Sequence, residues 1–118
     1  MVTNIQMTKN VNIHMVRGDS LIFSIKIRGL SGDLSSAYFT AQERVSANPI
    51  TGYTPQLFRK SLNDGITKVG DGEYTVRVAP SDTSGSSVES YDYDLEISYG
   101  EDVFTPIRGI LYIDKEVS

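Results

Sequence analysis

The chain has 118 residues, of which 39% are hydrophobic, with no cysteine, no tryptophan, a single histidine and a formal net charge of −4. This length predicts one domain over residues 1–118, and the ordinary apolar content excludes a disordered chain, a collagen and a coiled coil. The missing cysteines exclude disulfides and thiolate zinc sites, the negative charge argues against nucleic-acid binding, and no apolar run reaches the ~18 residues of a membrane-spanning helix.

Apolar and polar residues alternate along most of the chain, which predicts β-strands with one buried and one wet face. In chain order we expect strands over residues 11–16, 21–28, 37–45, 57–61, 66–69, 74–78, 91–99 and 103–113. The clearest alternation is the segment YDYDLEISY at 91–99. Because no long window keeps a helical period, the sequence predicts an all-β fold.

Turn residues separate the predicted strands. Asn63-Asp64-Gly65 and Gly70-Asp71-Gly72 are typical of tight turns. Short strands with frequent turns predict a two-sheet antiparallel β-sandwich of about seven to nine strands. The connection at 79–90 is long and rich in serine, and we expect it to begin with a short helical turn capped by Ser81 or Asp82.

The first ten residues are weakly patterned and lack both the basic start and the apolar stretch of a secretory signal. We expect residues 1–10 to form an N-terminal arm or a swapped edge strand. Charge is also uneven, since residues 1–61 hold seven Lys/Arg against three Asp/Glu and residues 62–118 hold four against twelve. Either the two halves interleave and the asymmetry cancels, or complementary faces favour self-association or docking.

The sequence offers few groups for catalysis. His14 is the single histidine, it falls on the polar side of its strand, and no G-x-S-x-G pattern is present. Gly70-Asp71-Gly72 precedes a strand, so it offers no helix N-terminus to hold a phosphate. We therefore predict no catalytic residue, no cofactor and no enzyme activity.

Asp92, Asp94 and Glu96 form an acidic stripe along one face of the predicted strand. Side chains two residues apart on a strand are roughly 6.5–7 Å apart, which is too wide for one calcium ion to bind all three. Two of them could hold a divalent ion only if the loop at 100–102 supplied further oxygens, and we predict no metal site. The stripe is interpreted as a solvated or partner-facing surface, with Lys or Arg expected on a neighbouring strand.

The long connection at 46–56 is the other candidate contact surface. It contains Pro49, Tyr53 and Pro55, and loops on a rigid sandwich often perform binding. Tyr53 lies between the two prolines and is the best candidate for a contact residue in this loop.

The order of several segments resembles that of a known group of proteins. These segments are Arg17-Gly18-Asp19 with the strand at 21–27, Asp33-Leu34-Ser35, the strand at 37–41, Gly72–Val76 leading to Asp82-Thr83, the strand at 91–97, and Thr105 with Gly109–Ile113. In this order they resemble the small β-sandwich virion proteins of tailed bacteriophages. The resemblance is greatest to the N-terminal domain of baseplate upper proteins and to related head or tail accessory modules.

This resemblance implies an Ig-like sandwich that works by docking and has no catalytic residues. It implies a structural protein of the virion, made in the host cytoplasm, that docks to or decorates the capsid, tail or baseplate through sheet edges and loops. Its expected partners are other virion proteins and copies of itself, with no nucleic acid and no membrane. The alternative is a free-standing β-sandwich module that binds a carbohydrate or a cell surface.

Overall fold

The computed structural model describes residues 2–4, 8–30, 32–44, 55–86 and 89–115. Its elements in chain order are β1 (Val2–Asn4), β2 (Lys9–Asn10), β3 (Ile13–Val16), β4 (Leu21–Arg28), β5 (Ser36–Glu43), β6 (Gln56–Leu62), β7 (Gly65–Gly70), β8 (Glu73–Val78), α1 (Pro80–Thr83), β9 (Ser90–Tyr99) and β10 (Asp102–Asp114). Each strand range predicted from the sequence overlaps one of these strands, so the all-β prediction is confirmed. Within the described residues, no helix is long and apolar enough to cross a membrane.

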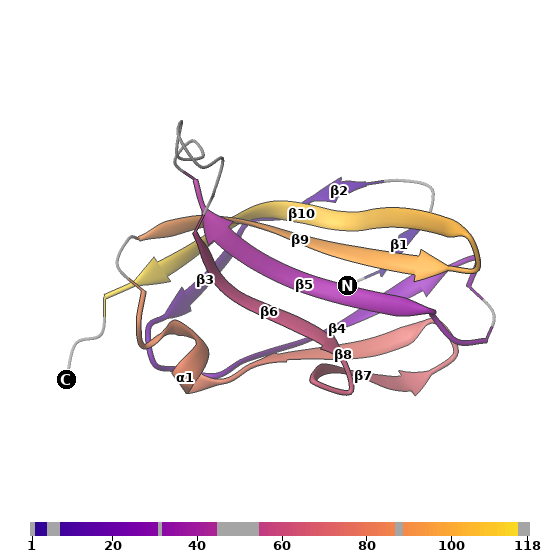
Figure 1. Cartoon of the computed structure of the whole chain (residues 1–118), viewed down its shortest axis with the longest axis horizontal. Coiled ribbons are helices and arrows are strands. Elements are labelled where there is room, and N and C mark those ends of the chain that lie inside the picture. The colour runs from indigo at the N-terminus through magenta and orange to yellow at the C-terminus, as the bar shows by residue number, and fades with distance from the viewer. Residues whose placement is uncertain (1, 5–7, 31, 45–54, 87–88, 116–118) are drawn as a thin grey trace.

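The predicted pair of separate antiparallel sheets is not confirmed. The strands form one curled sheet in the order β1-β4-β8-β7-β6-β5-β9-β10-β2, with β3 also paired to β10. The two halves are joined where Ser61 and Leu62 of β6 pair in parallel with Gly65 and Ile66 of β7. Figure 1 shows β5, β6 and β9 toward the viewer and β4 behind them, so the curled sheet still forms two layers.

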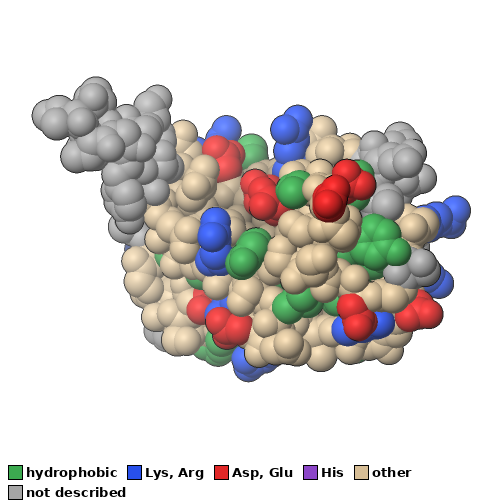
Figure 2. Space-filling model, turned by 45° about the vertical axis from the view of Figure 1, so that its right-hand side comes forward, with side chains coloured by type: hydrophobic (Ala, Val, Ile, Leu, Met, Phe, Trp, Pro, Cys, Tyr) green, Lys and Arg blue, Asp and Glu red, His purple; other side chains and the backbone are tan. Residues whose placement is uncertain are grey.

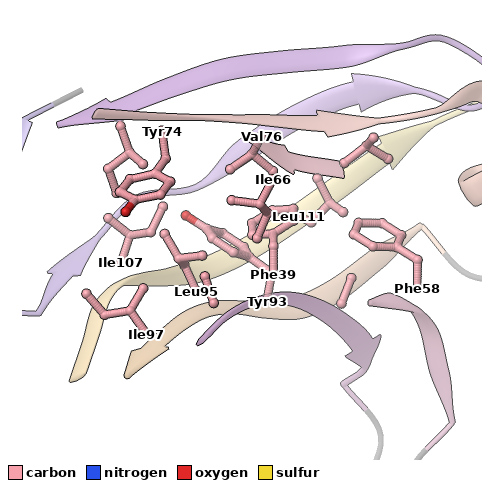
Figure 3. Close-up of a cluster of buried hydrophobic side chains, with 14 of the residues drawn as sticks. Phe39, Phe58, Ile66, Tyr74, Val76, Tyr93, Leu95, Ile97, Ile107 and Leu111 are labelled. Atoms are coloured by element: carbon pink, nitrogen blue, oxygen red, sulfur yellow. The ribbon is translucent and has the colours of Figure 1, made fainter. Parts of the chain in front are cut away.

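The core lies between these two layers. Phe39 of β5 is fully buried, and its ring centroid is 5.4 Å from those of Phe23 and Tyr93 and 5.8 Å from that of Phe58. Figure 3 shows Ile66 and Val76 of the other layer directed toward this group. The two layers are therefore stabilised mainly by apolar burial between strands that lie far apart in the sequence.

Strand β9 lies in the middle of the front layer, between β5 and β10. Its inward side chains Tyr91, Tyr93, Leu95 and Ile97 are at most 3% exposed, while the acidic residues between them face solvent. This alternation is the one predicted from the sequence.

Two strands within the N-terminal ten residues pair with the chain's own sheet. Strand β1 pairs in parallel with β4, with Val2 opposite Lys26, and β2 pairs in parallel with β10, with Lys9 opposite Ile107. Strand β3 continues along β10, with Ile13 opposite Leu111. The two described strands of the expected arm thus lie at opposite ends of the strand order, β1 at one end and β2 at the other.

The step from β2 to β3 is held by specific hydrogen bonds to β10. The Val11 N–H donates to the Arg108 carbonyl at 2.9 Å, and the Ile110 N–H donates to Oδ1 of Asn12 at 3.1 Å. The Tyr93 hydroxyl also donates to the Val11 carbonyl. This close approach requires glycine at position 109, because a Cβ there would lie 2.2 Å from the Val11 carbonyl oxygen.

The expected helical turn is present as α1, which lies beside β6 (Figure 1). Asp82, rather than Ser81, provides the cap, because its carboxylate accepts the Ala79 N–H at 2.7 Å. The same carboxylate forms a largely buried ion pair with Nζ of Lys60 at 2.8 Å. The connection at 79–90 is therefore tied to β6 by an ion pair.

The substitution Gly109→Ala is expected to lower the free energy of unfolding by about 1–3 kcal/mol, because the new methyl group would push the Val11 carbonyl away from β10. Urea denaturation followed by circular dichroism measures this change. Gly85→Ala is the matched control, since a Cβ at position 85 would meet nothing within 4 Å. Equal stability of the two variants would contradict the tight packing assigned to position 109.

Candidate docking face

The outward side chains of four adjacent strands form the candidate site, which we call the β9 face. It consists of Gln56, Arg59 and Ser61 on β6, Tyr38, Thr40 and Gln42 on β5, Asp92, Asp94 and Glu96 on β9, and Arg108 and Ile110 on β10. Over the side of the molecule seen in Figure 2, acidic and basic side chains are interspersed with uncharged ones.

Strand register places these side chains in rows that cross the sheet. In the central row, Asp94 lies opposite Thr40 on one side and Arg108 on the other, and Thr40 in turn lies opposite Arg59. The prediction that a neighbouring strand places Lys or Arg near the stripe is therefore confirmed at Arg108. Next to the stripe, Arg44 forms an exposed ion pair with Asp92 at 3.4 Å.

The two arginines of the central row are held by uncharged groups. Nε of Arg59 donates to Oγ1 of Thr40 at 3.1 Å, and its guanidinium carbon lies 5.0 Å from the centroid of the Tyr38 ring. Nε of Arg108 donates to Oδ1 of Asn10 at 3.4 Å. Arg59 is thus positioned by a hydrogen bond and a cation–π contact and Arg108 by one hydrogen bond, and neither arginine forms an ion pair with the acidic stripe in the described part of the chain.

Asp94 and Glu96 form no hydrogen bond or ion pair with any residue that the structure describes. Burial raises the pKa of the Asp94 carboxyl above its ordinary value, the charge of Glu96 raises it further, and Arg59 opposes the shift. The ionised form of Asp94 is thus disfavoured in the isolated chain.

Two open hollows flank the stripe, one on each side of β9. The first, between β5 and β9, has a volume of about 150 Å³ and is lined by Tyr38, Thr40, Gln42, Arg59, Asp92, Tyr93, Asp94 and Glu96. The second, between β9 and β10, has a volume of about 340 Å³ and is lined by Asn10, Asp92, Tyr93, Asp94, Arg108, Gly109 and Ile110. Both present mainly polar and charged groups, which suit hydrogen bonding and ion pairing.

Among the described residues, no group of three or more His, Asp or Glu side chains could hold a metal ion. His14 is exposed on β3, and its ring stacks on that of Tyr112 with centroids 4.5 Å apart. The strand register, with His14 opposite Tyr112, places the histidine beside β10.

The predicted contact loop is described only at its end. Pro49 and Tyr53 lie outside the described residues. Pro55 is half-buried at the start of β6, where its carbonyl accepts the Glu43 N–H at 2.9 Å. It belongs to the lining of a hollow of about 130 Å³ that also includes Tyr91.

Sequence reasoning identified the acidic stripe but missed Tyr38, Arg59 and Arg108 as its neighbours. Each falls in a strand that the sequence predicts, and the outward position of Tyr38 follows from its alternation with Ala37 and Phe39. What no local pattern reveals is that β5 and β10 flank β9 and that β6 flanks β5.

Comparison with known proteins finds similar solved structures. No protein-family model and no curated protein matches the chain. A similar solved structure is an extracellular domain of the voltage-gated sodium channel beta4 subunit, reported as parallel homodimers that explain its role in cell-cell adhesion. The two chains are 13% identical, the match covers 92% of this chain and 94% of the other, and the TM-score is 0.49.

The raised pKa of Asp94 predicts a pH-dependent stability. The carboxyl binds its proton more tightly in the folded chain than in the unfolded one. The free energy of unfolding therefore falls as the pH rises from the ordinary pKa of 3.8 through the raised pKa of the folded state. Asp94→Asn removes that loss, and we expect it to raise the free energy of unfolding at neutral pH by less than about 1 kcal/mol, because solvent screens the partly exposed group.

Urea denaturation at a series of pH values and at low protein concentration tests this prediction. Asp92→Asn is the matched control, since it instead removes the ion pair with Arg44 and is not expected to stabilise the fold. A neutral-pH gain that is equal in both variants, or absent at position 94, would contradict the assignment.

Proposed function

We propose that this chain is a non-enzymatic docking module that binds another protein subunit through the β9 face. The observation that carries the proposal is the acidic stripe itself. Asp94 and Glu96 have no hydrogen-bonding or ion-pairing partner among the described residues, and burial and the charge of Glu96 disfavour the ionised form of Asp94. A partner that supplies cationic or hydrogen-bond donor groups removes this unfavourable energy on binding.

The rigidity of β9 supports a docking role. The side chains between the acidic residues are buried against the other layer, and β9 is paired along its length with β5 and over two stretches with β10. The stripe is therefore fixed before binding, which lowers the entropic cost of association.

We further propose that the docking takes place in the particle of a tailed bacteriophage. Support for this setting comes from the resemblance of the strand and turn order to virion modules. The two-layer β fold is compatible with such a module, and we propose that it is an Ig-like sandwich. The partners are then capsid or tail subunits and other copies of the chain, and the protein is made in the host cytoplasm before it joins the virion.

Quantitative mass spectrometry of purified particles tests the proposal. The wild-type chain is expected at a fixed copy number relative to the major capsid protein. The double substitution Asp94→Lys, Glu96→Lys is expected to weaken attachment at least about tenfold, because two carboxylates at the interface become cations. Asp19→Lys makes the acid-to-lysine change at one position of the exposed turn before β4, half the charge change of the double variant, and is expected to leave the copy number unchanged.

Absence of the wild-type chain from particles would refute the virion setting. Full attachment of the doubly substituted chain would refute docking through the β9 face. The ratio to capsid protein also separates the locations, since decoration of the head requires a copy number comparable to that of the capsid subunit.

A carbohydrate-binding module is the second candidate, and the hollow between β5 and β9 is the observation that favours it. Its lining combines the Tyr38 ring with hydroxyl, amide and carboxylate groups, a combination suited to a sugar. In that case Tyr38→Ala is expected to abolish binding on a glycan array, while Tyr112→Ala, which removes a ring stacked on His14, retains it. A wild-type chain that binds no glycan on the array would exclude this function.

A further inference from the structure

We infer that the β9 face binds the same face of a second copy around a twofold axis that runs along β5, with Arg59 of each copy paired to Asp94 of the other. This inference rests on the proposed docking function and names its partner. It comes from the register of three neighbouring strands.

Three rows cross β6, β5 and β9, and all have the same arrangement. Each row has a carboxylate on β9, an uncharged polar residue on β5 and a hydrogen-bond donor on β6. The rows are Asp94–Thr40–Arg59, Asp92–Gln42–Gln56 and Glu96–Tyr38–Ser61. The same order of groups occurs in all three rows, and a register shift between Ala41 and Gln42 separates the row of Gln56 from the other two.

A twofold axis along the central strand converts this pattern into complementarity. Neighbouring strands lie about 4.8 Å apart, so β6 and β9 are equally distant from β5 on its two sides. Rotation about an axis parallel to β5 therefore places β6 of one copy over β9 of the other. In such an isologous contact every pairing occurs twice, and each carboxylate of the stripe meets a donor.

The groups at the centre of this interface suit burial. The outward side chains of β5 in the three rows are Tyr38, Thr40 and Gln42, all uncharged, and interface cores are poor in charged residues and rich in tyrosine. Arg59 is already held by Thr40 and the Tyr38 ring, so little side-chain freedom is lost when it binds Asp94. The raised pKa of Asp94 is consistent with a carboxylate that gains from a cation.

The other arginine of the row gives a poorer alternative. An axis between β9 and β10 would pair Asp94 with Arg108, but it would also place Asp92 over Ile110. The acidic stripe itself would then lie at the centre of the interface, where unpaired charge is most unfavourable. We therefore place the axis along β5.

Analytical ultracentrifugation of the full chain, from about 1 to about 200 μM, covers the affinities expected of a weak symmetric contact. The wild type is expected to form a dimer. Arg59→Glu and Asp94→Arg are each expected to weaken it at least about tenfold, because the reversed contact occurs twice. An equimolar mixture of the two variants is expected to restore a dimer, since both contacts between unlike chains again join opposite charges.

Arg108→Glu is the matched control and is expected to retain the dimer, with thermal unfolding used to show that every variant is folded. A wild type that remains monomeric, a mixture that does not reassociate, or an equal loss in Arg108→Glu would each overturn the proposal. These measurements use purified chain alone. If the chain forms no dimer but still attaches to particles, the second copy is excluded as the partner and the proposed docking function is retained.

Discussion

The burial of one side of β9 is the constraint on which the other features depend. Tyr91, Tyr93, Leu95 and Ile97 fill the space between the two layers, and their burial fixes the strand in a single register. A slip by one residue would turn the intervening carboxylates into the core, where unpaired charge is strongly unfavourable. The same apolar contacts that stabilise the fold therefore also hold the acidic stripe in place.

Much of the fold could be predicted from local patterns. Alternation gave the strands from β3 to β10, and the stripe followed from the strictest alternation in the chain. The pairing of strands could not be predicted in this way, since β5 and β9 are more than forty residues apart and their register depends on core packing. Arg59 therefore looked like an ordinary strand residue, and its place in a row with Asp94 became visible only when β6, β5 and β9 lay side by side.

The sheet differs from the predicted pair of antiparallel sheets where short parallel contacts join its parts. Two residues of β6 pair with β7, and the first strands pair with β4 and β10. Such contacts are too short to show as alternation in a sequence. They depend instead on single residues. The carboxamide of Asn12 accepts a backbone hydrogen bond that the sheet would otherwise leave unpaired, and the missing Cβ of Gly109 lets the backbone of Val11 approach β10 closely.

The pairing of β3 with β10 has a consequence for how the chain reaches this structure. Ile13 lies opposite Leu111, so β3 cannot pair until β10, which lies almost one hundred residues later in the chain, has been synthesised. Contacts with so large a sequence separation slow folding, because the loop must close before they contribute. The N-terminal segment must therefore wait for β10 to leave the ribosome. Until then the β10-facing edge of β9 stays open, and crowded nascent chains are exposed to pairing with one another.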